Sequence, residues 1–277
     1  MLYVAVVVYN KKINEIASVE NLRRLLAHHS ENIKIIVVDN SDKAPFNELD
    51  DEEKKFISQN GVVYIKSDNN QGLSKAYNKA VKYALHEKKN PDSSFVLFVD
   101  DDTVIPYAYF RRIYLESKSA RRQSDGVNVI TGFVESDGRP MSPVWGFRFR
   151  FSSKDYIVKP GIYNNIACIS SGMAVRLSAL KRIKGFDERL FLDMIDYTML
   201  YNLGRRNLCK VLVVDEKLVQ DFSGRSNLSR DAVEKRFGIY KKDFNTFCNI
   251  TRRGKLYAKL HLFKRRIAIE YKVRRNQ

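Results

Sequence analysis

The sequence predicts an α/β protein with a mostly parallel central sheet that is flanked by helices on both faces. Two observations support this fold class. Short, almost continuously apolar segments rich in valine and isoleucine alternate with amphipathic segments over the first hundred residues, a pattern typical of parallel strands covered by helices. The chain has 277 residues, 44% of them hydrophobic, which is enough to bury one large core.

The first part of the chain has a regular β-α-β order. Strands are expected where the segments are apolar and β-branched, at residues 3–9, 33–39, 62–66 and 95–100. Helices are expected between them, at residues 13–29 and 73–89. The second helix has the clearer pattern, because its apolar residues recur on one face, at Leu73, Ala76, Tyr77, Ala80, Val81, Ala84 and Leu85.

Past residue 125 the pattern is less regular. Further strands are expected at residues 127–134, 145–151, 165–175 and 210–216, the third interrupted by a turn at Ser170-Ser171-Gly172. A short helix is expected at residues 177–183, and a loop running into a helix at 184–204. From about Lys217 the chain becomes polar, helical and basic.

The net charge of +17 is concentrated at the end of the chain, where 12 Lys and Arg face two acidic residues between Tyr240 and Gln277. An anionic surface is therefore an expected partner. Nucleic acid is not expected as that partner, because the sequence has no recognisable nucleic-acid-binding module. The three cysteines lie far apart, which favours a reducing cytosol. The first apolar stretch indicates a strand and not a signal peptide, and no apolar run approaches the roughly 18–20 residues of a membrane-spanning helix.

Polar side chains follow each of the first four expected strands. They are Tyr9-Asn10, Asp39-Asn40-Ser41, the segment 67–72, and Asp100-Asp101-Asp102. In sheets of this kind, ligands bind beyond the carboxyl ends of the strands. We therefore expect the four clusters to converge on one crevice.

The three consecutive aspartates have two interpretations. They could form a solvated turn that caps the next helix, with Pro106 in its first turn. Alternatively, Asp100 and Asp102 could bind one hard cation, Mg²⁺ or Mn²⁺. The phosphates of a substrate would then complete the coordination shell of that ion. Because a buried strand delivers these carboxylates to the ligand-binding edge, a metal–diphosphate site is favoured.

Five segments together resemble a known family. They are "VAVVVYNK" at the N-terminus, "IIVVDNSD", "NNQGLSKAYNKAV", the Asp-x-Asp of "VDDDT", and "SSGMAV" followed by "KGFDERLFLDMIDYTML". In this order they are similar to inverting nucleotide-sugar glycosyltransferases of the A-type (GT-A) fold, in glycosyltransferase family 2, which includes bacterial rhamnosyl- and galactofuranosyltransferases. The resemblance covers roughly residues 3–225.

The resemblance implies a role for individual residues of this chain. Asp196 matches the catalytic base, with Asp193 as a neighbour; helix capping is the alternative for both. Asp100 and Asp102 match the metal motif. The positions implied to bind the donor are Tyr9, Asn10, Asp39, Asn40, Asn70, Gly72, Asp100 and Asp101. Asn78 matches a recurring asparagine of the helix.

The sequence departs from the family pattern at three positions. Ile195 stands where many relatives have a second acid, Asn202 where they often have an arginine, and Gln220 where many place a histidine near the metal. Arg205 or Arg206 could replace that arginine. Gln220 is a weaker metal ligand than histidine.

The resemblance implies a metal-dependent inverting transferase that moves a sugar from a UDP- or dTDP-sugar to a glycan or lipid-linked acceptor in bacterial cell-surface polysaccharide synthesis. A non-catalytic sugar-nucleotide-binding or anion-binding protein on a degenerate fold is the alternative. A nucleotidyltransferase is disfavoured, because no N-terminal glycine-rich loop with a following basic residue is present. Trp145 and its expected strand are interpreted as core packing or as a platform for stacking a sugar.

We expect a catalytic domain at residues 1–216 and a basic helical C-terminal extension at 217–277. The nucleotide-binding half is placed at about 1–105 and the acceptor half at about 106–216. In the extension, Leu256, Leu260, Phe263, Ile267 and Tyr271 lie near one helical face. This helix could lie on an anionic bilayer or dock on the catalytic domain. The expected location is cytoplasmic, including attachment at the inner face of the plasma membrane.

Overall fold

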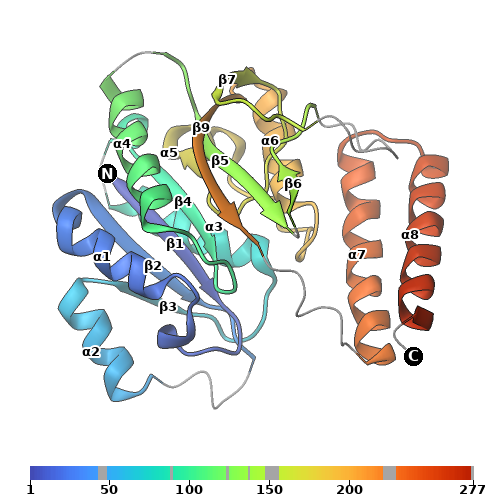
Figure 1. The fold of residues 1–277 in the computed structure, drawn as a ribbon, viewed down its shortest axis with the longest axis horizontal. Helices are drawn as coiled ribbons and strands as arrows, with labels where there is room; N and C mark the ends of the chain where they lie inside the picture. Colours follow the sequence, from blue (N-terminus) through green and yellow to red (C-terminus); the bar gives the residue numbers. More distant parts are fainter. Residues whose placement is uncertain are drawn as a thin grey trace.

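The computed structural model describes residues 1–42, 49–87, 90–122, 125–136, 138–146, 156–220 and 229–275. A central sheet has helices on both faces, and a pair of helices at the C-terminal end lies at one side of the molecule (Figure 1). The predicted α/β class with a helical C-terminal part is confirmed.

Four parallel strands form one half of the sheet. Their bounds are β1 (Leu2–Val8), β2 (Ile33–Asp39), β3 (Val63–Lys66) and β4 (Phe95–Asp100). They lie in the order β3-β2-β1-β4, so the chain reverses its direction of winding between β1 and β4. This is the kind of switch point at which α/β sheets bind ligands.

Strand β1 shows why these segments are apolar throughout. Successive side chains of a strand point to opposite faces. Tyr3, Ala5 and Val7 pack in one core cluster with α3 (Leu73–His86), whereas Leu2, Val4, Val6 and Val8 pack in a second cluster with helices on the other face. Because both faces of β1 are buried, residues on either face must be apolar.

The second half of the sheet is mixed. Its strands are β5 (Val129–Ser136), β6 (Arg139–Ser142), β7 (Gly161–Asn164), β8 (Ala174–Arg176) and β9 (Lys210–Val219). Strand β8 is antiparallel to both β4 and β5, whereas β5 and β9 are parallel. The full order is β3-β2-β1-β4-β8-β5-β9-β7, with β6 paired to β5.

Two expected strands differ from the structure. The segment 165–175 is strand only at its end, where β8 begins, because the Asn165 and Gly172 backbones have φ of 54° and 82° and interrupt extended structure. The expected strand 145–151 lies mostly outside the described residues, and its described part, Trp145 and Gly146, is a bend.

The helices that flank the sheet are α1 (Val19–His29), α2 (Asp51–Asn60), α3, α4 (Tyr107–Arg122), α5 (Leu177–Ile183) and α6 (Ile195–Gly204). Short 3₁₀ turns are η1 (Ile13–Glu15), η2 (Ser30–Asn32) and η3 (Pro91–Ser93). The helix expected to begin at residue 13 therefore begins at Val19, after η1. Helix α2 was not anticipated, because only Glu53 and Phe56 of its ten residues are buried.

Two long helices end the chain, α7 (Arg230–Ile250) and α8 (Lys255–Arg275). In Figure 1, α7 lies next to the sheet-containing part and α8 is outermost. Tyr240, Phe244 and Phe247 of α7 form a small core with Ala258 of α8, and Met194 and Tyr197 pack against it. None of the helices in the described part of the chain has the length and hydropathy needed to span a bilayer.

Candidate active site

The carboxyl ends of β1, β2 and β4 meet beside the first turns of α3 and α6. Tyr9 and Asn10 follow β1, Asp39 ends β2, and Asp100 ends β4. The backbone N–H of Tyr9 donates to a carboxylate oxygen of Asp101 at 2.9 Å, which links the first of these ends to the last. The structure thus brings residues from distant parts of the sequence to one edge of the sheet.

The loop after β1 is held by contacts with β2 and α2. The Tyr9 hydroxyl donates to Asp42 at 2.7 Å, and the Asn10 N–H donates to the Ser41 hydroxyl at 2.9 Å. The Asn10 backbone is left-handed, with φ of 51°, a conformation that asparagine tolerates better than most residues. Tyr9 is 44% exposed, so its ring is available to a ligand.

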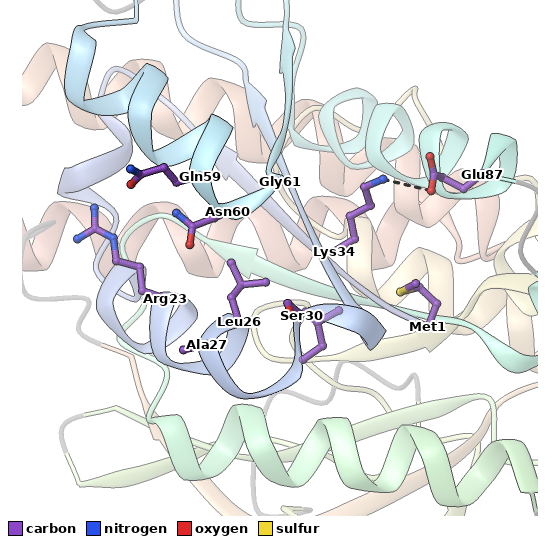
Figure 2. Close-up of a pocket in the computed structure, with 11 residues that line it drawn as sticks. Met1, Arg23, Leu26, Ala27, Ser30, Lys34, Gln59, Asn60, Gly61 and Glu87 are labelled. Atoms are coloured by element: carbon purple, nitrogen blue, oxygen red, sulfur yellow. Dashed lines mark hydrogen bonds and ion pairs between the residues drawn. The ribbon is translucent and has the colours of Figure 1, made fainter.

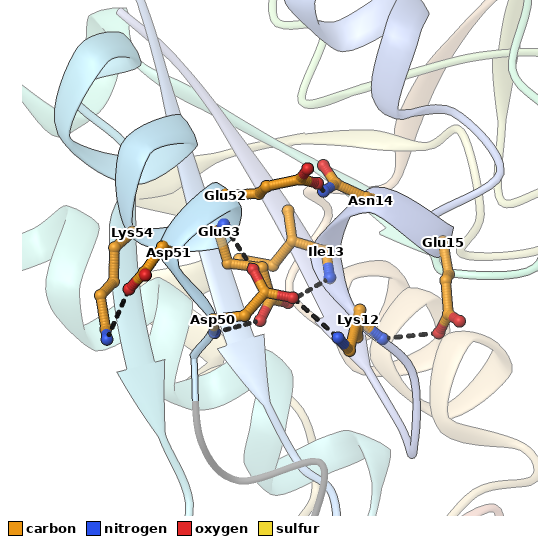
Figure 3. Close-up of polar contacts among 9 residues, drawn as sticks. All are labelled: Lys12, Ile13, Asn14, Glu15, Asp50, Asp51, Glu52, Glu53 and Lys54. Carbon is orange, nitrogen blue, oxygen red and sulfur yellow. Dashed lines mark hydrogen bonds and ion pairs between the residues drawn. The ribbon is translucent and has the colours of Figure 1, made fainter.

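A buried carboxylate fixes the far end of the same loop. Glu53, in the first turn of α2, accepts from the Ile13 N–H at 2.7 Å and from the Asp50 N–H at 3.0 Å. Asp50 caps α2 and pairs with the Lys12 ammonium at 2.7 Å (Figure 3). The polar helix that sequence patterning overlooked therefore holds the loop that carries Tyr9 and Asn10.

Asp39 and Asn40 are both buried at the end of β2. Asp39 accepts from the Tyr64 hydroxyl at 2.6 Å and from the Ser41 N–H at 2.9 Å. The Asn40 side chain donates to Asn70 at 3.0 Å and accepts from the Gln71 N–H at 3.1 Å. These contacts couple the end of β2 to the turn that precedes α3.

Gly72 is the point at which that turn meets the loop before α6. Its φ is 88°, and a Cβ at this position would lie 2.7 Å from both the ring and the carbonyl oxygen of Phe191. The Leu73 N–H donates to the same Phe191 carbonyl. Only glycine permits this approach, because any side chain would separate the two segments.

The three aspartates after β4 have different surroundings. Asp100 accepts from the Tyr77 hydroxyl at 2.6 Å. Asp101 pairs with the Lys11 ammonium at 3.1 Å, although burial raises the pKa of its carboxyl. Asp102 is exposed, and the Thr103 hydroxyl donates to it at 3.3 Å. The Asp101 carboxylate is thus bound by Tyr9 and Lys11, whereas Asp102 faces solvent.

Among the described residues, no group of three or more His, Cys, Asp or Glu side chains is arranged to hold a metal ion. Gln220 provides another kind of donor. Its side-chain carbonyl oxygen is buried and has no hydrogen-bond partner among the described residues. An antiparallel bridge between Val104 and Val219 brings Gln220 alongside the segment that follows Asp102. Two carboxylates and an orphaned amide oxygen fit a hard cation that also binds phosphate.

Asp196 lies in the first turn of α6. The Tyr197 N–H donates to it at 2.7 Å and the Ser170 N–H at 3.3 Å. Although part of the residue is accessible, the pKa of its carboxyl is raised to about 7. Burial is the main cause and the negative charge of Asp100 adds to it, whereas the backbone donors act in the opposite direction. The Ser171 hydroxyl, next to Ser170 in the chain, accepts from the Asp100 N–H at 3.4 Å, so adjacent residues link Asp196 to the end of β4.

Asp193 has a different environment. Within one helix, its spacing of three residues from Asp196 would put both on the same face, but α6 begins only at Ile195, and Met194 between them is left-handed with φ of 63°. The Arg236 guanidinium of α7 pairs with both oxygens of Asp193, one at 2.8 Å. The carboxylate of Asp193 is therefore occupied by a structural ion pair.

Asp243 of α7, which sequence reasoning overlooked, organises the loop before Asp196. Its fully buried carboxylate accepts three backbone N–H groups, from Phe191 at 2.9 Å, Leu192 at 2.8 Å and Asp193 at 2.8 Å. The pattern of residues in α7 did not indicate this role of Asp243, because the sequence does not distinguish a buried aspartate from one on the surface. The C-terminal helices thus take part in building the candidate site.

Two further expected positions have structural surroundings. Asn78 of α3 accepts from the Phe186 N–H at 2.8 Å and donates back to the Phe186 carbonyl at 2.9 Å, so it anchors the segment that leads to Asp193. Trp145 is 51% exposed and packs edge-on against Tyr163 at 5.4 Å. The structure therefore does not place Trp145 in the core.

A surface pocket of about 600 Å³ lies at the opposite edge of the sheet (Figure 2). Its lining includes Met1 before β1, Ile33 at the start of β2, Leu26 of α1 and Gly61 after α2. Lys34 and Glu87 form an ion pair at 3.2 Å on its rim. Because it adjoins the amino ends of the strands, it is separate from the candidate active site.

Comparison with known proteins gives a family and a fold. The model of the family described as "Glycosyl transferase family 2" matches residues 3–183. No curated protein matches the sequence. Among solved structures, TarS of S. aureus is 16% identical with a TM-score of 0.53, covering 90% of this chain and 40% of that chain.

Two further structures have the same fold. GalNAc-T7, solved with UDP, GalNAc and Mn²⁺, is 14% identical with a TM-score of 0.56, over 80% of this chain and 43% of that one. The mannosyltransferase PcManGT from Pyrobaculum calidifontis, solved with GDP-Man and Mn²⁺, is 13% identical with a TM-score of 0.52, over 94% of this chain and 69% of that one. The chain spans less than half the length of TarS and of GalNAc-T7.

Proposed function

Because the chain belongs to glycosyl transferase family 2, we propose that it is an inverting, metal-dependent glycosyltransferase that uses a nucleoside-diphosphate sugar. The observation that carries the proposal is the position of Asp196 next to the end of β4, where the Ser170 N–H donates to its carboxylate and the neighbouring Ser171 hydroxyl accepts from the Asp100 N–H. Burial also raises the pKa of Asp196 to about 7, which suits a general base at neutral pH.

The donor is proposed to lie along the carboxyl ends of β1, β2 and β4. Tyr9 and Asn10 would border the base and ribose, beside the buried pair Asp39 and Asn40. The turn at Asn70 and Gly72 would bring backbone N–H groups of α3 toward the diphosphate, where the helix N-terminus favours negative charge. Lys11, paired with Asp101, adds a cation to the same edge.

Asp100 and Asp102 are proposed to hold Mg²⁺ or Mn²⁺, with Gln220 as a further oxygen ligand. The exposure of Asp102 and the orphaned oxygen of Gln220 support this set. The ion, when bound, would neutralise charge on the departing nucleoside diphosphate. Tyr77 keeps Asp100 in place, because its hydroxyl donates to that carboxylate.

Asp196 is proposed to accept the proton of an acceptor hydroxyl as that oxygen bonds to the anomeric carbon. The bond from the anomeric carbon to the diphosphate oxygen breaks in the same step, and its electron pair leaves with the nucleoside diphosphate. Attack on the face opposite the leaving group inverts the anomeric centre. Ser170, whose N–H contacts Asp196, lies in the 170–172 turn that would border the acceptor.

The acceptor is proposed to be a glycan or lipid-linked sugar of bacterial cell-surface polysaccharide synthesis, used on the cytoplasmic side of the plasma membrane. We propose residues 1–216 as the catalytic domain, with donor and acceptor halves that meet near residue 105, and 217–277 as its extension. Trp145, which is exposed and packs edge-on against the partly buried Tyr163, is proposed to stack on an acceptor sugar.

The test is a panel of UDP-, dTDP- and GDP-sugars, with and without Mn²⁺, combined with soluble glycans and lipid-linked acceptors. Release of nucleoside diphosphate that depends on metal and acceptor is the expected result, and NMR of the product gives the anomeric configuration. Retention of configuration would overturn the single displacement. Nucleotide binding without turnover on any pair would favour the alternative, a non-catalytic sugar-nucleotide-binding protein.

A further inference from the structure

Helix α8 has two apolar faces, and the described part of the chain covers only one of them. On the covered face, His261 stacks on Phe244 of α7 at 4.2 Å and contacts the Tyr240 hydroxyl at 2.8 Å, and Ala258 is buried. Arg265 lies over the Tyr240 ring at 3.6 Å. The orientation of α8 about its axis is therefore set by α7.

The opposite face carries the five large apolar residues that we call the α8 stripe. They are exposed by 70%, 49%, 65%, 52% and 69% at Leu256, Leu260, Phe263, Ile267 and Tyr271. Their spacing of three and four residues places them along one side of the helix, over about 22 Å. These exposed fractions leave the stripe open to the surroundings, and α8 is the outermost helix in Figure 1.

Basic side chains flank the α8 stripe. At 100° per residue, Lys259 lies on one side of the stripe and Lys264 on the other, and both are exposed. Arg266 is held by Glu234 and Glu270, so it serves the packing of the two helices. Between Lys255 and Tyr271 the sequence has five basic residues and a single acid, Glu270.

We propose that the α8 stripe is the surface by which this protein attaches to an anionic lipid bilayer. An apolar row flanked by lysines is the arrangement that inserts into the boundary between headgroups and acyl chains. The lysines would then lie at the level of the anionic headgroups. Exposed apolar rows of this size are uncommon on monomeric proteins without a binding role.

The charge around the α8 stripe favours an anionic bilayer over a second copy of this chain as its binding partner. If two α8 stripes packed together, their flanking lysines would approach one another, and Glu270, the one acid of the segment, is already paired with Arg266. Like charges brought together across an interface oppose association. An anionic bilayer supplies the complementary charge along the whole helix.

This surface does not depend on the proposed chemistry. Asp196 and the stripe lie on different elements, and the stripe faces away from α7 and hence from the loop that Asp243 holds. Substitutions on the stripe are therefore expected to leave transfer to a soluble acceptor unchanged. Loss of membrane binding and loss of catalysis can thus be distinguished.

The test is co-sedimentation of the full chain with vesicles of phosphatidylcholine alone or with about one third phosphatidylglycerol. We expect at least tenfold stronger binding to the anionic vesicles, weakened by high salt. The variant Leu260→Ser/Phe263→Ser/Ile267→Ser is expected to lose this binding. Its matched control, Val158→Ser/Ile162→Ser, removes exposed apolar side chains elsewhere and is expected to bind normally.

A charge variant completes the test. Lys259→Gln/Lys264→Gln is expected to reduce anionic binding severalfold, whereas Lys54→Gln/Lys55→Gln on α2 is expected to leave it unchanged. Equal binding to both vesicle types, or normal binding by the stripe variant, would overturn the proposal. So would a dimer in lipid-free sedimentation analysis that the stripe substitutions dissociate, because the stripe would then be a self-association face.

Discussion

Asp243 accepts hydrogen bonds from the segment 191–193, Asp196 follows that segment in the chain, and the two carboxylates have different numbers of donors. Asp243 accepts three backbone N–H groups, all within 2.9 Å. Asp196 accepts two, one of them at 3.3 Å, and burial raises its pKa to about 7. A buried carboxylate with three short backbone hydrogen bonds fixes a loop, whereas one with two donors, one of them distant, remains available as a base.

The largest expected effect is on transfer by Asp196→Asn. The amide is nearly the same size but cannot take a proton, so transfer should fall about 100- to 10,000-fold. Donor affinity should stay within a factor of about three, because the change lies outside the proposed donor contacts. Steady-state kinetics and calorimetry measure the two quantities.

A wild-type transfer rate in that variant would mean that the base is elsewhere. Asp193 would then be examined, although Arg236 occupies it. Glu188→Gln, a partly exposed acid earlier in the same segment, is the matched control and should retain transfer.

The next effect concerns the aspartates after β4. We expect Asp102→Ala to weaken Mn²⁺-dependent binding of a nucleoside diphosphate by about 10- to 100-fold, as losses of metal-site groups do. Asp100→Ala should also weaken this binding. Its effect is not on the metal site alone, because the substitution also leaves the Tyr77 hydroxyl without the carboxylate that it contacts. Calorimetry with and without Mn²⁺ measures both.

Asp215→Ala, which removes an exposed acid from β9 and not from the Asp-x-Asp motif, serves as the control for lost charge. Its metal dependence should match the wild type. Unchanged affinity in both Asp102→Ala and Asp100→Ala would instead show that the triplet is a solvated turn.

Asp243→Asn tests the other side of the comparison. The amide group replaces one acceptor oxygen, so at least one buried backbone N–H loses its partner. The free energy of unfolding should fall by about 2–3 kcal/mol. Transfer should fall about tenfold because the loop before Asp196 is less firmly held.

Urea unfolding and single-turnover rates measure these changes. Asp231→Asn, on the exposed start of α7, is the matched control and should change neither. If Asp243→Asn lowered stability but left the single-turnover rate of the folded protein unchanged, the carboxylate would support the fold without positioning the base.

The smallest effect is the pH dependence of stability. Burial raises the pKa of Asp196 in the folded state to about 7, from an ordinary aspartate value of 3.8. Between these two pH values the folded protein therefore holds the proton more tightly than the unfolded chain does. The contribution of Asp196 to stability is present at low pH and is lost as the pH rises toward and through 7. Between pH 6 and 8 the loss should be about 1.4 kcal/mol.

Metal-free urea titrations of wild type and Asp196→Asn should therefore converge at low pH, and the variant should gain relative stability toward pH 8. Parallel pH profiles of the two proteins would contradict a raised pKa. Adding Mg²⁺ and a nucleoside diphosphate should lower the pKa, since positive charge near Asp100 favours the ionised carboxylate.

Local pattern was sufficient for the buried parallel strands and for α3. Strands β2 and β4 have the expected bounds, 33–39 and 95–100, because segments buried on both faces must be apolar throughout. Helix α2 and strand β7 were not predicted. They lie near the surface and bury few side chains, so their sequences carry little periodic signal.

The sequence by itself determined the α/β class, the polar ends of its strands and the apolar row on α8, because each depends on residues that are close in the chain. Only the tertiary structure decided that Asp243 holds the turn before Asp196, that Arg236 occupies Asp193, and that the row on α8 faces outward. These outcomes depend on contacts between segments about 50 residues apart or on which face of a helix its neighbour covers. Neither leaves a trace in local periodicity.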